Sequence, residues 1–331
     1  MAKVLGFLVL LGSLFAGWAW MEYETFRTTS LQIPQGSMTY RVEKGTNLAV
    51  IANDLEAAGA IGNADYLRWY GRYTGIAKRI RAGEYRLTDE LTPDGLFALL
   101  VSGRSISYSL TLLEGWNIRQ VLAAVAGHEA LESTLEGADP AELMRRLGRE
   151  DLHPEGRFFP DTYRFTRGMT DLEFLRRAML KMDQELAAAW AEKAEDIPLK
   201  NADEALILAS IVEKETGQAS ERAQIAGVFA RRLRKGMRLQ TDPTVIYGMG
   251  ERFDGNIRRK DLREDTPYNT YVHAGLPPTP ICMPGRDALR AAVNPADGKT
   301  LYFVARGDGS HVFSATLDKH NAAVRKYQLK R

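Results

Sequence analysis

The sequence predicts an α+β protein built from an N-terminal transmembrane helix, a small α+β module and a larger mixed α+β domain. Three observations lead to this prediction. An uncharged apolar run opens the chain, short strand signals alternate with amphipathic helices from residue 39 onward, and prolines break the pattern repeatedly beyond residue 236. A chain of 331 residues is long enough for two or three domains with cores of their own.

The first element is the apolar run Val4–Trp20, which holds seventeen uncharged residues and predicts a membrane anchor at 4–20. Lys3 precedes it, so a cytoplasmic tail of residues 1–3 and export of the rest are expected. Trp18 and Trp20 occupy the position of an interfacial aromatic belt. The alternative is a cleaved signal peptide, although the residues before Trp20 form a poor cleavage site.

Residues 21–38 have little periodicity and are interpreted as a linker. A module at 39–105 follows, with strand signals at 40–42 and 83–87 and helical patterns at 47–58, 64–73 and 93–101. The run YRVEKGTNLAVIANDLEAAGAI resembles a LysM-like module, a family that binds the glycan of bacterial cell walls. A small α+β spacer without a ligand is the alternative.

The larger domain is expected at 106–331. It begins with a strand at 107–113 and a helix at 118–125, followed by two short helices around Gly137. Long helices are predicted at 171–197, 201–217 and 220–235, and the basic end of the third is expected to be solvated. A strand pair at 301–305 and 311–315 and a final helix to about residue 329 complete the order.

The helix at 201–217 carries the main chemical candidate. Asn201 and Glu204 form a pattern like a capping box, and Gly217 offers a stop. On a helical wheel Glu215 falls within about 20° of Leu208, on the apolar face, whereas Glu213 falls on the far side. Burial and the helix dipole both raise the pKa of such a carboxyl, as a general acid requires. A cap, an arginine pair or a solvated last turn is the alternative.

Irregular segments supply the other candidates. Residues 154–165 (PEGRFFPDTYRF) could line a sugar groove with their rings or tuck Phe158 and Phe159 into the core. Prolines exclude a long helix from 238–248 and 266–285. Polar and aromatic side chains concentrate in these loops, where sites tend to lie.

Other chemistries find no support in the sequence. A net charge of +2 implies no nucleic-acid partner, and the five histidines are too scattered for a metal site. No phosphate-binding loop or GxSxG elbow occurs, so no cofactor is expected. Cys282 could form a nucleophile with His273, but an isolated thiol is far more often inert. The candidate chemistry stays with Glu215, with Glu213 and Asp242 as possible partners.

Six motifs resemble the YceG-like (MltG) endolytic murein transglycosylases, and they occur in one order from about residue 107 to the C-terminus. They are FPDTY, ASIVEKET, RLQTDPTVIYG, YNTY, GLPP and PG. The loop GLPPTPICMPG departs from the family, which more often has Gly at the place of Thr279 and Asn at that of Met283. The resemblance implies a lyase on peptidoglycan and makes 106–331 the catalytic domain.

The resemblance also implies a mechanism and a location. The catalytic glutamate of the family matches Glu215, which would protonate the MurNAc–GlcNAc bond within a strand and leave a 1,6-anhydro end. Candidates for positioning the sugar are Gln240, Asp242, Tyr268, Asn269 and Tyr271, each of which could instead only shape its loop. The expected setting is the bacterial inner membrane with the catalytic domain on the periplasmic side, and peptidoglycan synthases are candidate partners.

Two alternatives to this function remain open at the level of sequence. A hydrolytic muramidase would use Asp242 or Glu213 to activate water on the same substrate. A membrane-tethered scaffold that binds the wall without cleaving it would use no catalytic carboxyl. The mass of the product separates the first alternative from a lytic enzyme, and neutralising Glu215 separates the second.

Overall fold

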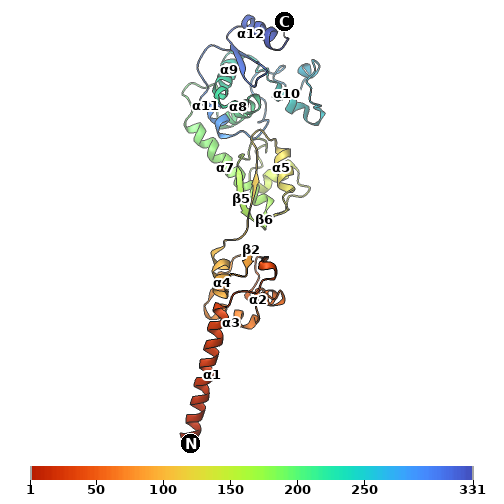
Figure 1. Ribbon diagram of the computed structural model, residues 1–331. Helices are drawn as coiled ribbons and strands as arrows, with labels where there is room; N and C mark the ends of the chain where they lie inside the picture. Colours follow the sequence, from red (N-terminus) through yellow and green to blue (C-terminus); the bar gives the residue numbers. More distant parts are fainter. Residues whose placement is uncertain (1, 330–331) are drawn as a thin grey trace. The chain divides into compact units, whose positions relative to one another are not determined.

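A computed structural model describes residues 2–329 of the chain (Figure 1). The fold is mixed α+β, and each of the four sheets that the described residues form has two strands. Contacts divide the chain into two compact units. The first holds residues 1–108 and 164–168, and the second holds residues 109–163 and 169–331.

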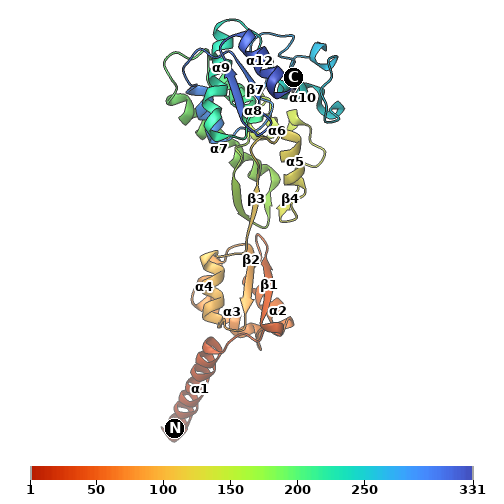
Figure 2. The same ribbon diagram turned by 45° about the horizontal axis from the view of Figure 1, so that its top comes forward.

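The first unit is a small α+β module preceded by a long helix. Its elements are α1 (Ala2–Thr28), η1 (Pro34–Gly36), β1 (Ser37–Val42), α2 (Leu48–Ala57), α3 (Ala64–Tyr73), η2 (Ile76–Arg79), β2 (Gly83–Thr88) and α4 (Pro93–Ser102). Strands β1 and β2 pair antiparallel, with Tyr40 opposite Tyr85 (Figure 2). Side chains from both strands and from α2, α3 and α4 share one core that includes Ile51, Leu67 and Phe97.

Helix α1 is apolar enough over Lys3–Thr28 to cross a membrane, with a mean hydropathy of 1.9. It extends past Trp20 to Thr28, into the stretch that we expected to be a linker. Tyr23 and Phe26 pack against the core of the module, and Leu31 and Ile33 are buried in it. The expectation of an irregular linker over 21–28 was therefore wrong, because the side chains there have a core to pack against.

The second unit contains most of the helices. Its elements are α5 (Ile118–Ala126), β4 (Leu131–Glu132), α6 (Pro140–Leu147), β6 (Met169–Thr170), α7 (Asp171–Ala191), α8 (Ala202–Glu215), η3 (Ala219–Glu221), α9 (Arg222–Arg234), α10 (Asp242–Met249), η4 (Gly250–Arg252), η5 (Asp261–Arg263), α11 (Arg286–Val293), β7 (Tyr302–Ala305), β8 (His311–Ser314) and α12 (Leu317–Tyr327). Strands β3 (Ser107–Thr111) and β5 (Thr162–Thr166) pair with each other, and each contributes residues to both units.

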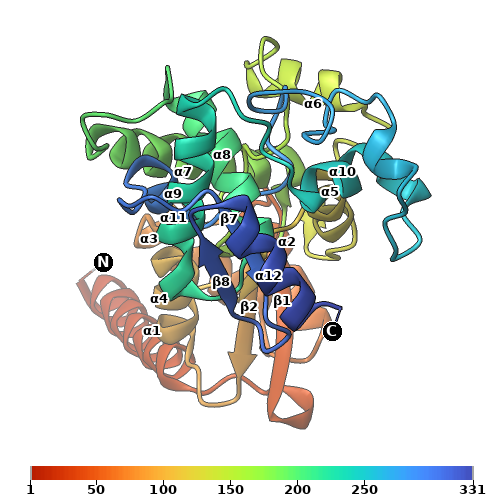
Figure 3. The same cartoon turned by 90° about the horizontal axis from the view of Figure 1, so that it is seen from above.

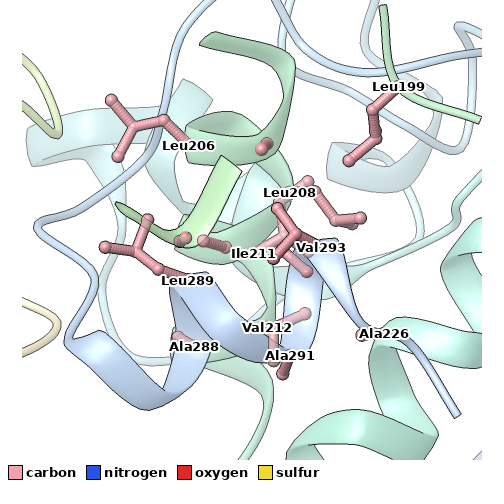
Figure 4. Close-up of a cluster of buried hydrophobic side chains, with 14 of the residues drawn as sticks. Leu199, Leu206, Leu208, Ile211, Val212, Ala226, Ala288, Leu289, Ala291 and Val293 are labelled. Carbon is pink, nitrogen blue, oxygen red and sulfur yellow. The ribbon is translucent and has the colours of Figure 1, made fainter. Parts of the chain in front are cut away.

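Helix α8 lies at the centre of the second unit. Its side chains Leu208, Ile211 and Val212 are fully buried, and they meet side chains of α9 and α11 in one cluster (Figure 4). The far side of α8, with Leu206 and Ala209, is buried as well. A helix buried on nearly all sides holds its last residue in a fixed place, so the end of α8 is a rigid platform.

A hairpin and a helix close the second unit. Strands β7 and β8 pair antiparallel, with Phe303 opposite Phe313. Figure 3 shows this hairpin lying between α12 and α9. The ring of Phe303 meets that of Phe229 in α9 edge-on at 5.8 Å, which fixes the hairpin to the core.

Two sequence-based expectations for this unit were wrong, and the structure decides between two alternatives for a third segment. One short helix, α6, stands where we expected two, because residues 131–132 form strand β4. For the aromatic segment the core-packing alternative is confirmed, since Phe158 and Phe159 are buried in the core, as is Tyr163. The arginines at the end of α9 are not all solvated, since Arg232 is 7% exposed and donates to backbone carbonyls of neighbouring loops.

Candidate active site

Glu215 is the last residue of α8. Asn201 caps the start of this helix by accepting a hydrogen bond from the Glu204 amide, and the Glu204 carboxylate accepts from the Lys200 amide. The helix ends earlier than Gly217 predicted, because Thr216 is already extended with φ −146°. The extended residue turns the chain away, so the Glu215 side chain projects from the end of a buried helix.

A cavity of about 520 Å³ opens over this carboxyl. Glu215 and Arg232 contribute from α8 and α9, and Gln240, Asp242 and Tyr271 from the loops around α10. The opposite wall comes from the β7–β8 hairpin and α12, through Tyr302, Phe303, Val304, Ala305, His311, Leu317, His320, Asn321, Val324 and Gln328. Both polar and aromatic groups therefore surround the carboxyl, as a sugar site requires.

The pKa of Glu215 is raised to about 7, mainly by burial, and the negative charge of Asp242 acts in the same direction. The hydrogen bond from the Thr241 hydroxyl to Oε1 acts in the opposite direction, because it stabilises the carboxylate. The charges of His311 and Arg232 also lower the pKa. The balance leaves Glu215 able to exist in both protonation states near neutral pH, which suits a group that must give and then take a proton.

Threonines hold the Thr241 hydroxyl in place. The Thr241 amide donates to Oγ1 of Thr270 at 3.1 Å, and the Thr244 hydroxyl donates to the Thr241 carbonyl at 2.8 Å. Gln240, the preceding residue, has a positive φ of 52°. A non-glycine residue in this conformation is held there by its surroundings, and such positions cluster at functional sites. Its amide donates to the Thr270 carbonyl at 3.1 Å, which anchors the turn.

Asp242 and Tyr271 form the polar rim of the cavity. The Tyr271 hydroxyl donates to Oδ1 of Asp242 at 2.6 Å. Burial and this hydrogen bond both raise the pKa of Tyr271, so the phenol stays protonated. Asp242 is exposed, and among the described residues its second oxygen accepts no hydrogen bond, so a sugar hydroxyl could donate to it.

Tyr268 and Asn269, the other two predicted positioning residues, are not among the described residues that line this cavity. Tyr268 packs its ring on Tyr247 at 4.8 Å, and its hydroxyl is 2.9 Å from that of Thr279. Asn269 is 1% exposed and donates to the carbonyls of Asp261 and Glu264. Both side chains organise the loop that carries Tyr271.

Glu213 and Cys282 also point away from the cavity. Oε2 of Glu213 accepts from the Gly285 amide at 2.9 Å, and the carboxylate pairs with Arg222 at 3.4 Å. Cys282 is fully buried, and burial raises the pKa of its thiol well above the usual range. His273 pairs with Asp265 at 2.6 Å. A protonated thiol without access to solvent cannot act as a nucleophile.

Sequence reasoning missed the residues of the opposite wall and Arg232. The His311 ring lies 2.7 Å from Oε2 of Glu221 through Nδ1, and the His311 amide donates to the same carboxylate at 2.9 Å. Arg232 lies over the Tyr302 ring at 5.1 Å and donates to the Leu239 carbonyl at 2.8 Å. The only signal in the sequence was a histidine two residues after the Gly-Asp-Gly turn, and periodicity does not reveal which cavity a strand lines.

Comparison with known proteins adds family membership to this geometry. A family model described as the YceG-like family matches residues 40–326. An endolytic murein transglycosylase of Bacillus subtilis is 32% identical over 324 residues, which cover 93% of this chain and 87% of the relative. An endolytic murein transglycosylase of Streptococcus pneumoniae serotype 2 is 27% identical, and the match covers 98% of this chain and 65% of that protein.

The fold is also similar to that of a solved structure from the same family. The crystal structure of a YceG-like protein from Listeria monocytogenes superposes with a TM-score of 0.54 and 28% sequence identity. The superposition covers 87% of this chain and 99% of the other. Since the family model spans most of the sequence and the fold is shared, this chain belongs to the YceG-like family.

Proposed function

We propose that this protein is an endolytic murein transglycosylase, a lyase that cuts glycan strands of peptidoglycan internally. The observation that carries the proposal is a single carboxyl, Glu215, with its pKa raised to about 7 at the base of a polar and aromatic cavity. The names of the relatives from Bacillus subtilis and Streptococcus pneumoniae support the same activity.

The proposed reaction uses Glu215 twice. The protonated carboxyl donates to the oxygen between N-acetylmuramic acid and N-acetylglucosamine, and that bond breaks as positive charge develops on the anomeric carbon. The C6 hydroxyl of the same muramyl residue attacks this carbon, and its proton passes to the Glu215 carboxylate. The products are a 1,6-anhydro-muramyl end and a free N-acetylglucosamine end, and the enzyme regains its proton.

One acid/base suffices in this scheme because the nucleophile belongs to the substrate and is present at high effective concentration. A hydrolase needs a second carboxylate to activate water or to form a covalent intermediate. Gln240, Asp242 and Tyr271 are proposed to position the sugar from the rim of the cavity. Tyr268 and Asn269 are proposed to act indirectly, by shaping the loop that presents Tyr271.

The decisive experiment is Glu215→Gln, which keeps the shape of the side chain and removes its proton chemistry. We expect release of anhydro-muramyl products from purified sacculi to fall by about 10²–10⁴-fold, the usual contribution of a general acid. Mass spectrometry of the released glycan measures the amount of anhydro-muramyl product. Glu213→Gln is the matched control, because this carboxyl lies on the same helix yet bonds to Gly285.

The outcomes separate the competing functions. Undiminished cleavage by the Glu215→Gln variant, with an unchanged melting temperature, would refute the proposal. Products that carry one additional water would identify a hydrolytic muramidase, for which Asp242 in the same cavity is the candidate base. Unchanged glycan binding and unchanged function in cells without any cleavage would identify a scaffold.

We propose two further features of the setting. The apolar helix α1 anchors the chain in the inner membrane with the second unit on the periplasmic side, and peptidoglycan synthases are candidate neighbours there.

Residues 39–105 are proposed to be a LysM-like module that holds glycan, on the strength of the sequence around Lys44 and Thr46. Lys44 is exposed and Thr46 is half-buried, so replacing them should lower co-sedimentation of the Glu215→Gln chain with sacculi. Unchanged co-sedimentation would favour a spacer.

A further inference from the structure

Helix α3 of the first unit exposes a stripe of large aromatic side chains. Tyr66, Trp69 and Tyr73 are 40%, 76% and 86% exposed. Their spacing of three and four residues places all three on one side of the helix. Leu67 and Tyr70 of the same helix are buried against the core. Single exposed aromatics are common on soluble proteins, but a contiguous stripe marks a surface that binds something apolar.

This stripe continues onto helix α1. A cavity of about 250 Å³ lies between the two helices and is lined by Phe15, Trp18, Tyr23 and Phe26 of α1 and by Tyr66 and Trp69 of α3, among others. The Phe26 and Tyr66 rings meet edge-on at 5.6 Å. The ion pair of Arg27 with Asp94 at 3.0 Å ties the end of α1 to α4. Helix α3 is therefore held beside the last turns of α1.

The length of α1 sets the depth of α3. At 1.5 Å per residue, the 27 residues of α1 span about 40 Å, close to the thickness of a bilayer with its headgroup layers. The uncharged run 4–20 covers about 25 Å of this and fits the hydrocarbon region. Residues 21–28 then cross the headgroup layer over about 12 Å. Since α3 meets α1 at Phe26, α3 lies in that layer too.

The chemistry of the surface agrees with this depth. Tyrosine and tryptophan prefer the boundary between headgroups and acyl chains, because one end of the ring is apolar and the other forms hydrogen bonds. Arg72, Lys78 and Arg79 are exposed in and just after α3. Exposed cations beside aromatic rings are typical of segments that lie on anionic membranes.

We propose that the aromatic face of α3, formed by Tyr66, Trp69 and Tyr73, is a lipid-binding surface that sits in the outer headgroup layer beside the anchor. This inference rests on the proposed membrane anchor and is independent of the chemistry at Glu215. Its consequence is that the first unit is fixed to the bilayer by two elements, α1 and α3. A module held at two points cannot swing freely about the end of its anchor.

The test uses the full chain in vesicles of phosphatidylethanolamine and phosphatidylglycerol, with and without bromine on the acyl chains near the headgroups. Subtracting the emission of the Trp69→Phe variant from that of the wild type isolates the Trp69 signal. We expect brominated lipid to remove about half of this signal or more, as for a ring at the interface. Trp190→Phe supplies the control, because Trp190 packs against the core of the second unit and its signal should be unaffected.

Each result decides the matter. A Trp69 signal quenched by aqueous iodide and unaffected by brominated lipid would overturn the inference and leave the face to water or a protein partner. Failure of the chain to float with vesicles after an alkaline wash would overturn both the anchor and the lipid surface. Glycan cleavage by the same vesicles is read separately, so loss of lipid contact with intact cleavage refutes this inference alone.

Discussion

At the residue scale, the groups around Glu215 shift its pKa in opposite directions. Burial and Asp242 favour the protonated carboxyl, whereas the Thr241 hydroxyl stabilises the carboxylate. A carboxyl with a pKa near 4 would be ionised at neutral pH and could not donate, and one far above 7 would be a weaker acid toward the glycosidic oxygen. The pKa of about 7 places the group between these extremes.

At the residue scale, Thr241→Val should move the pH dependence of the reaction. The general acid must be protonated, so kcat/KM falls as pH rises through the pKa of Glu215, which is about 7. Valine removes the hydrogen bond that lowers this pKa, so the midpoint of the decline should shift upward by roughly half a unit to one unit. Initial rates measured across pH provide the test.

Thr279→Val is the matched control for that measurement. Thr279 has the same side chain but pairs with Tyr268 outside the lining of the cavity, so the midpoint should stay in place. A midpoint that is the same in the Thr241→Val variant and the wild type would show that the descending limb belongs to another group.

At the scale of elements, a second buried carboxyl, that of Glu155, connects helices of the second unit. Glu155 is fully buried, and its two oxygens accept from the Ile118 amide at 3.0 and 3.2 Å. Ile118 is the first residue of α5, and Oε2 also accepts from the Tyr247 hydroxyl of α10 at 2.9 Å. Glu155 thus joins the irregular aromatic segment to two helices. Its hydrogen bonds satisfy an amide that the start of α5 would otherwise leave without a partner.

Glu155→Gln should therefore change how stability depends on pH. Burial raises the pKa of Glu155 to about 7 in the folded state, so the folded protein binds more protons than the unfolded chain between the two pKa values. The wild type must lose stability as pH rises across that window. Relative to the wild type, the glutamine variant should gain about 3 kcal/mol between pH of about 4.5 and 8.

Urea unfolding at both ends of that range measures this difference, and Glu155→Ala provides the contrast. Alanine leaves the Ile118 amide and the Tyr247 hydroxyl without an acceptor, which should cost about 3 kcal/mol relative to the glutamine variant at any pH. If the difference between the glutamine variant and the wild type did not depend on pH, the carboxyl would have to be ionised in the folded protein throughout.

The whole molecule combines a cleaving unit with a module that carries an apolar helix. The cavity lies entirely within the second unit, where α8, α9, α12 and the β7–β8 hairpin meet. The helix α1 lies entirely within the first. This separation means that attachment and chemistry can be tested independently of each other.

At this scale the chain should remain with membranes after alkaline extraction, because α1 has the length and hydropathy of a spanning helix. Protease added to spheroplasts should digest the second unit, since the positive charge before the apolar run predicts a cytoplasmic N-terminus. Release by alkali together with a mature mass lacking the first residues would instead identify a cleaved signal peptide.

Local patterns determined much of this protein. The bounds of α2, α3 and α4 agree closely with the sequence-based prediction, because caps such as Asn47 and Asn63 and a proline at the start of α4 are local signals. The wheel placed Glu215 on the apolar face, and the structure has it at the end of a buried helix. The motifs predicted the family that the comparison then found.

Only the tertiary structure decided which residues surround Glu215. Thr241 and His311 lie 26 and 96 positions beyond it in the sequence, and no periodicity links them. Tyr268 and Tyr271 have the same chemistry and lie three residues apart, yet one packs on Tyr247 and the other lines the cavity. Helices and caps arise from neighbours within about four residues, whereas a cavity arises where distant segments pack together, so only the folded chain reveals its walls.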